Sequence, residues 1–113
     1  DGALGSRVII ELGSNGPFTD KQLDSLLQSL KDVQQVVLIN AKVPRKWEET
    51  VNKALAEAAD NYPNVTLVDW YSASKGELSY FYKDGVHLTA KGAAYYASLI
   101  VKKLEPEKGE PRP

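Results

Sequence analysis

The sequence contains neither cysteine nor methionine. Without Cys among its 113 residues, the chain has no disulfide, no thiolate nucleophile and no cysteine-based metal site. This is typical of cytosolic proteins and of bacterial proteins outside the cytoplasm, and it does not choose between them. Without Met, Asp1 cannot be a translation start. We therefore expect a cleavage product or a piece of a longer protein.

Long apolar runs and a strong net charge are also absent. No stretch approaches the roughly 20 apolar residues that span a bilayer, and no secretory signal is present. The net charge is −1, so no global field attracts nucleic acid or an anionic membrane. The composition, 42% hydrophobic and 26% charged, is that of a soluble globular protein, and the length predicts one domain.

Short apolar runs alternate with stretches of helical periodicity. Thr19 and Gln22 predict a capping box at the first helix, and Thr89 predicts the cap of the last. Predicted buried strands cover 7–12, 35–40 and 65–69, predicted helices cover 19–31, 46–61 and 90–104, and a long irregular loop covers 72–85. This order predicts an α/β domain over residues 1–104, with helices on both faces of a parallel sheet. Residues 105–113 carry three prolines and predict a disordered tail.

Three strands are few for a doubly wound sheet. Parallel strands are normally buried on both faces, and Arg7-Val8-Ile9-Ile10 is too apolar for an exposed edge. We therefore expect further strands before Arg7. Without them, the isolated chain should be unstable or self-associate.

Ligands of parallel α/β sheets bind beyond the carboxyl ends of the strands. Gly13-Ser14-Asn15-Gly16 follows the first predicted strand, where it can be a plain turn, an anion cradle or a donor to an oxyanion. The only histidine, His87, follows Asp84 by three residues. This pair can be a loop salt bridge, or a base whose tautomer the carboxylate fixes.

Other polar and aromatic residues near these loops have simple structural explanations. Arg45 and Trp47 are candidate substrate contacts, although surface charge and helix packing explain them more simply. Asn52 is expected to be solvated or to cap a helix, and the aromatic residues 80–82 are expected to pack the loop.

The order and context of these motifs favour the catalytic interpretation. Gly13-Ser14-Asn15 after a strand, and Asp84-Gly85-Val86-His87 before the last helix, resemble the third and fifth blocks of the SGNH (GDSL-like) hydrolase family. More narrowly, "ELGSNG", "VPRKWEETVN" and "YKDGVHLTAKGAAYYASLI" are similar to the C-terminal SGNH domain of membrane-bound peptidoglycan O-acetyltransferases. The resemblance covers Arg7 to about Leu104.

One departure from the family pattern is informative. The family's Gly-Asp-Ser block, whose serine is the nucleophile, does not occur in this sequence, and neither does the second-block glycine. Both would precede Arg7. Ser14 neighbours the expected oxyanion donor, so we do not expect it to attack. The resemblance thus implies the C-terminal part of an SGNH domain, with its serine on a segment outside this chain.

The resemblance also implies a reaction. An acetyl group would pass from a serine ester to a hydroxyl of cell-wall glycan, or to water. His87 would be the base, Asp84 would orient it, and Asn15 would bind the oxyanion, with Arg45 and Trp47 as candidate acceptor contacts. No metal or organic cofactor is needed. The parent protein would be membrane-anchored and act outside the cytoplasm.

Two rival functions remain open. The first is a non-catalytic SGNH-like module that binds glycan. The second is a flavodoxin-like protein that binds phosphate at the glycine-rich turn. Pro17 and Phe18 follow that turn, and no Lys or Arg is close behind it, which counts against the second.

Overall fold

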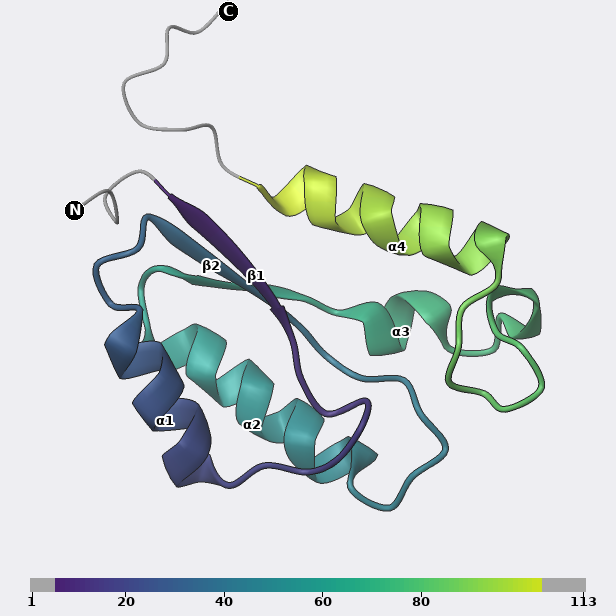
Figure 1. Ribbon diagram of the computed structural model, residues 1–113, viewed down its shortest axis with the longest axis horizontal. Coiled ribbons are helices and arrows are strands. Elements are labelled where there is room, and N and C mark those ends of the chain that lie inside the picture. Colours follow the sequence, from purple (N-terminus) through teal and green to yellow (C-terminus); the bar gives the residue numbers. More distant parts are fainter. Residues whose placement is uncertain (1–5, 105–113) are drawn as a thin grey trace, which may run out of the picture.

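The computed structural model describes residues 6–104, which form a three-stranded parallel sheet with helices on both faces (Figure 1). The predicted tail, 105–113, and residues 1–5 of the predicted domain lie outside the described residues. The strands, in spatial order, are β1 (Arg7–Glu11), β2 (Gln35–Ile39) and β3 (Val65–Val68). The helices are α1 (Asp20–Ser29), α2 (Glu48–Asn61), α3 (Trp70–Ser74), the 3₁₀ helix η1 (Leu78–Tyr80) and α4 (Ala90–Lys103).

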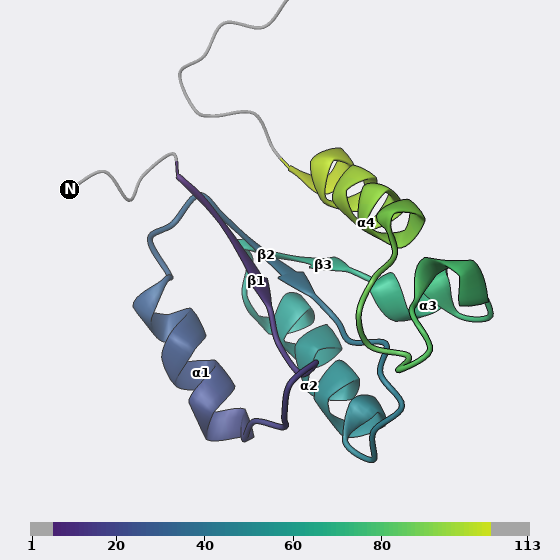
Figure 2. The ribbon, with the colours of Figure 1, turned by 45° about the vertical axis from the view of Figure 1, so that its right-hand side comes forward.

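The central strand, β2, is buried along its whole length because it has apolar side chains on both faces. Val36 and Leu38 belong to the core shared with α1 and α2, whereas Val37 and Ile39 belong to the core shared with α4. Figure 2 shows α1 and α2 on one face of the sheet and α4 on the other. The predicted α/β class, with a parallel sheet between helices, is confirmed.

The helix starts follow local capping chemistry. The Thr19 side chain accepts from the Gln22 amide at 3.0 Å, and the Gln22 side chain accepts from the Thr19 amide at 2.8 Å, so the predicted capping box is confirmed. Thr89 caps α4 by accepting from the Gly92 amide. Helix α2 begins at Glu48, two residues later than predicted. No helix in the range 6–104 combines the length and apolar character needed to cross a bilayer.

Strand β1 is not the buried strand that its apolar composition predicted. It lies at one edge of the sheet, and its residues are exposed or half-buried in alternation. Ile9 is 48% exposed, although Val8 and Ile10 are partly covered. Helix α4 packs over β2 and β3 and makes its main contacts with the sheet at β3, the edge opposite β1, which explains why Ile9 stays uncovered. Within residues 6–104, β1 pairs with a strand on one side only.

The segment after β3 is more ordered than the irregular loop predicted over 72–85. It contains α3 and η1, held together by the buried indole of Trp70. The Tyr80 ring stacks on Trp70 with centroids 6.0 Å apart, and Tyr96 of α4 meets it edge-on at 5.1 Å. Aromatic packing between residues distant in sequence therefore stabilises the short helices of this segment. Such packing leaves no periodic pattern in the sequence of the segment itself.

Candidate active site

The loops that follow the three strands meet at one cavity of about 360 Å³. Residues from the end of β1, from each of the following loops and from α4 line it: Glu11, Ser14, Asn15, Lys42, Trp70, Val86, His87, Leu88 and Tyr96. The loops after the three strands therefore share one edge of the sheet, as the predicted parallel topology requires. The structure brings Asn15 and His87 to the same cavity, although they are far apart in the sequence.

His87 and Asp84 form a tightly paired unit. The imidazole Nδ1 lies 2.5 Å from Asp84 Oδ2, and Asp84 Oδ1 accepts from the backbone amides of Val86 at 2.8 Å and His87 at 3.0 Å. The hydrogen bond with the His87 side chain, followed by those two amides, lowers the pKa of Asp84 to about 2. An ionised carboxylate only accepts hydrogen bonds, so the proton of a neutral imidazole is on Nδ1 and the lone pair is on Nε2.

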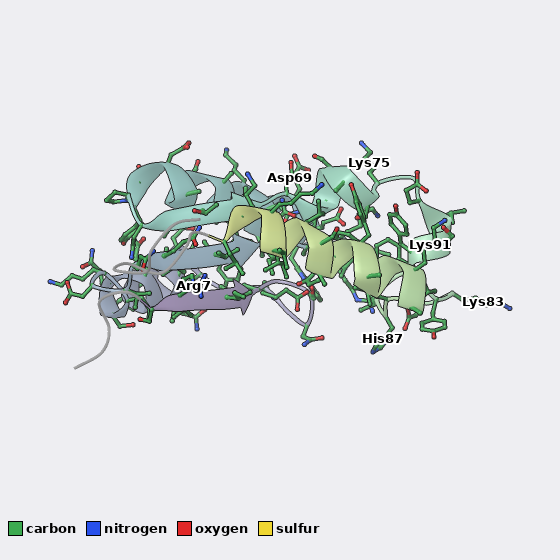
Figure 3. The ribbon with its side chains drawn as sticks, turned by 90° about the horizontal axis from the view of Figure 1, so that it is seen from above. Arg7, Asp69, Lys75, Lys83, His87 and Lys91 are labelled. Carbon is green, nitrogen blue, oxygen red and sulfur yellow. The ribbon has the colours of Figure 1, made fainter. Side chains whose placement is uncertain are left out.

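The His87 side chain faces solvent and is 78% exposed. In Figure 3 it lies beyond the carboxyl ends of the strands, on the side of β1, whereas Arg7 marks the opposite end of that strand. The imidazole is thus accessible from the side of β1 on which no strand within residues 6–104 pairs.

The Gly-Ser-Asn-Gly turn presents Asn15 at the cavity, and the serine of the turn is held by a hydrogen bond to Glu11. Gly13 has a φ of 97°, a conformation that favours glycine. The Ser14 hydroxyl donates to the carboxylate of Glu11, with Oγ and Oε2 2.5 Å apart. Its proton is therefore directed away from His87, and among the hydrogen bonds of residues 6–104 none joins His87 to a serine. The expectation that Ser14 does not attack stays a prediction.

Two further ionisable side chains, those of Tyr96 and Lys42, line the cavity. Burial, followed by the nearby charge of Glu11, raises the pKa of Tyr96, so its hydroxyl stays protonated. Lys42 is half-buried, and its Nζ lies 5.9 Å from the centre of the Tyr71 ring. No group of three or more His, Asp or Glu side chains in the described range gathers in a way that could hold a metal ion.

Neither Arg45 nor Trp47 is among the residues that line this cavity. Arg45 is exposed, and its guanidinium donates to the Pro44 carbonyl at 3.1 Å. The Trp47 indole Nε1 donates to the Gly13 carbonyl at 2.7 Å. The expectation that they contact an acceptor stays a prediction.

Asn52 is not the solvated or capping residue that was expected. Its side chain accepts from the Ala41 amide at 2.8 Å and donates to the Ala41 carbonyl at 2.7 Å. Four residues earlier on the same helix, Glu48 accepts from the Val43 amide at 2.7 Å. The first turns of α2 therefore hold the loop after β2. The only sequence signal was two polar residues at helical spacing on the apolar side of a helix.

A second polar contact that sequence reasoning missed fixes the end of β3. The buried Asn40 donates to Asp69 Oδ1 at 2.9 Å and accepts from the Tyr71 amide at 2.8 Å. Burial alone would raise the pKa of Asp69, but hydrogen bonds from Asn40 and from Ser72 outweigh it, so the pKa is lowered. Asn40 thereby joins the end of β2 to the start of α3, which directly follows β3.

The fold and the cavity define an α/β protein whose strand-end loops carry an oriented histidine and a nearby side-chain amide. No family model matches the chain. It is 53% identical over 95 residues, 84% of its length, to the peptidoglycan O-acetyltransferase OatA of Listeria monocytogenes. It is 46% identical over 101 residues, 89% of its length, to the O-acetyltransferase OatA of Staphylococcus aureus. The chain is a homologue of one segment of the peptidoglycan O-acetyltransferases, and it spans only 15% of the first relative and 17% of the second.

Proposed function

We propose that this chain supplies the base, its orienting carboxylate and an oxyanion donor to an SGNH-type serine O-acyltransferase that acetylates hydroxyls of cell-wall glycan. The observation that carries the proposal is the shared cavity of Asn15 and His87, with Nδ1 of His87 held by Asp84. The names of the relatives support acetyl transfer and peptidoglycan as the substrate class. In this proposal the reaction takes place outside the cytoplasm, where peptidoglycan lies.

In the first half-reaction, a serine attacks the carbonyl carbon of the acyl donor. His87 Nε2 takes the hydroxyl proton, and Asp84 stabilises the imidazolium that forms. The carbonyl oxygen becomes an oxyanion, to which the Asn15 amide donates. One such donor typically lowers the barrier by about 2.7–4 kcal/mol. The intermediate collapses, the leaving group takes the proton from His87, and the serine keeps the acyl group.

In the second half-reaction, a glycan hydroxyl or water attacks the acyl-serine. His87 takes the proton of the attacking hydroxyl and returns it to the serine oxygen as the ester bond breaks. Asn15 again stabilises the oxyanion. The exposed Arg45, in the loop between β2 and α2, is the proposed contact for the acceptor.

The nucleophile in this proposal comes from a segment outside residues 1–113. The sequence has no Gly-Asp-Ser, and the one serine at the cavity, Ser14, donates its hydroxyl to Glu11. Within residues 6–104 no strand pairs with the outer edge of β1, and a further parallel strand would add there. Such a strand would end beside Asn15 and His87. We call the chain together with this serine-bearing segment the completed domain.

Hydrolysis of an aryl acetate tests the proposal. The chain alone is expected to be inactive and the completed domain active. His87→Ala should lower kcat of the completed domain by about 10⁶-fold, which is the size of the loss when the histidine base of a serine triad is removed. Lys83→Ala, an exposed change in the same loop, is the matched control and should leave kcat unchanged.

Three outcomes would count against the proposal. Activity that survives His87→Ala would contradict the role of the histidine. Turnover by the chain alone would contradict the external serine. Saturable glycan binding by the completed domain, with no turnover of any acetyl ester, would favour the non-catalytic module instead.

A further inference from the structure

The indole of Trp47 has a defined partner that links two loops of the site. Its Nε1 donates to the Gly13 carbonyl across 2.7 Å, and Gly13 lies two residues before Asn15. We propose that Trp47 is a positioning residue, which holds the Asn15 amide where the oxyanion forms. This inference rests on the proposed function of Asn15, and it differs from the acceptor contact that the sequence predicted.

The position of Gly13 against α2 leaves the turn little freedom. Gly13 is buried and has a φ of 97°. A Cβ at this residue would lie 2.8 Å from Cγ2 of Val51. Trp47 and Val51 are one helical turn apart, so both contacts come from the same side of the helix start. Val51 sets how closely the turn approaches the helix, and the directional hydrogen bond from Trp47 sets its orientation.

The start of α2 and the loop before it also contact the loop that carries His87. Val86, next to His87, packs against the buried cluster of Ala41, Val43 and Val51, and so does Trp47. Pro44 lies beside Gly85, where an added Cβ would meet the proline ring at 3.3 Å. The loop after β2 and the start of α2 therefore touch the neighbours of both groups, and fix the separation of Asn15 and His87.

The hydrogen bond from Trp47 is therefore expected to matter for rate rather than for substrate affinity. Its indole N–H donates to the Gly13 carbonyl and Trp47 does not line the cavity, so the side chain does not touch a bound substrate there. Removing only the N–H leaves the Gly13 carbonyl without this donor, so the turn can rotate and move the Asn15 amide. Misplacing a catalytic group by about 1 Å can cost roughly 100-fold in rate.

The test is a double-mutant cycle in the completed domain, with an aryl acetate as substrate. Trp47→Phe keeps a ring and removes the N–H. It should lower kcat roughly 10- to 100-fold and leave KM and the pH dependence of the rate unchanged. In the Asn15→Ala background, the same change should cost almost nothing, because residues that act through one another are not additive. Tyr62→Phe, at the other end of α2, is the matched control and should leave kcat unchanged.

The outcomes separate this inference from the proposed function. If Asn15→Ala leaves kcat intact, the oxyanion role fails. If Asn15→Ala lowers kcat but Trp47→Phe does not, or if Trp47→Phe costs the same in both backgrounds, only the positioning role fails. Should Trp47→Phe unfold the protein, replacement of Trp47 by benzothienylalanine keeps the bicyclic shape without the N–H. This variant must show the same loss of kcat, or the inference is wrong.

Discussion

Replacement of Asn52 by alanine should destabilise the fold far more than the same replacement at an exposed position of the helix. Asn52 satisfies both backbone polar groups of Ala41, with bonds of 2.8 and 2.7 Å. Ala41 is 0% exposed, so water does not readily replace these bonds. The substitution also frees the loop after β2 from the helix that holds it.

The magnitude follows from the number of groups left without a partner. One buried donor or acceptor left unsatisfied costs about 1–3 kcal/mol. Two groups give a ceiling of about 6 kcal/mol, and partial access of water from the half-buried side of Asn52 reduces it. We expect a loss of about 2–4 kcal/mol in the free energy of unfolding, or more than about 10 °C in Tm for a domain of this size.

Urea unfolding of the completed domain, followed by circular dichroism, measures this loss, with Lys53→Ala as the matched control at the next, exposed position. The control should change stability by less than about 0.5 kcal/mol. Amide hydrogen exchange at Ala41 gives a local readout, and protection there should fall in Asn52→Ala. Equal stability of the two variants, with Ala41 still protected, would refute the reasoning.

Three further predictions follow from the same contacts. Gly92→Ala would normally stabilise a helix by about 1 kcal/mol. Here its Cβ would lie 2.2 Å from the Tyr80 carbonyl oxygen, so calorimetry should show a lower Tm, whereas Gly16→Ala, with nothing within 4 Å, is the control and should not lower it. The hydrogen bond with His87 lowers the pKa of Asp84 to about 2, from its ordinary value of 3.8. Its contribution to stability is then present above pH 3.8 and lost as the pH falls through about 2. Asp84→Asn should flatten the acid-unfolding curve in that window, and an unchanged curve would contradict the pairing. The chain alone should sediment as an oligomer or melt well below the completed domain, because β1 pairs with a strand on one side only in the part of the chain that the structure describes. A stable monomer would contradict this.

The alternation of strands and helices could be predicted because each element carries its own signal. Apolar runs mark β2 and β3, helical spacing marks α1 and α2, and the capping threonines mark the starts of α1 and α4. The pairing of Asp84 with His87 was also a local matter, since the two residues are three apart. The place of Asn15 at the same cavity followed from parallel sheet topology.

The remaining features depend on contacts between residues distant in sequence. The exposure of Ile9 depends on which element lies beside β1, which its own composition cannot tell. The order of α3 and η1 comes from aromatic packing around Trp70. Asn52 and Trp47 contact backbone groups of other segments, and a polar or aromatic residue at a helix start does not show its partner.

The central claim is that His87 of this chain activates a serine outside it. Labelling the completed domain with a serine-directed sulfonyl fluoride, followed by peptide mass mapping, tests it most directly. The account predicts one labelled serine outside residues 1–113, and loss of that label in His87→Ala. A label on Ser14, or labelling that persists without His87, would contradict it.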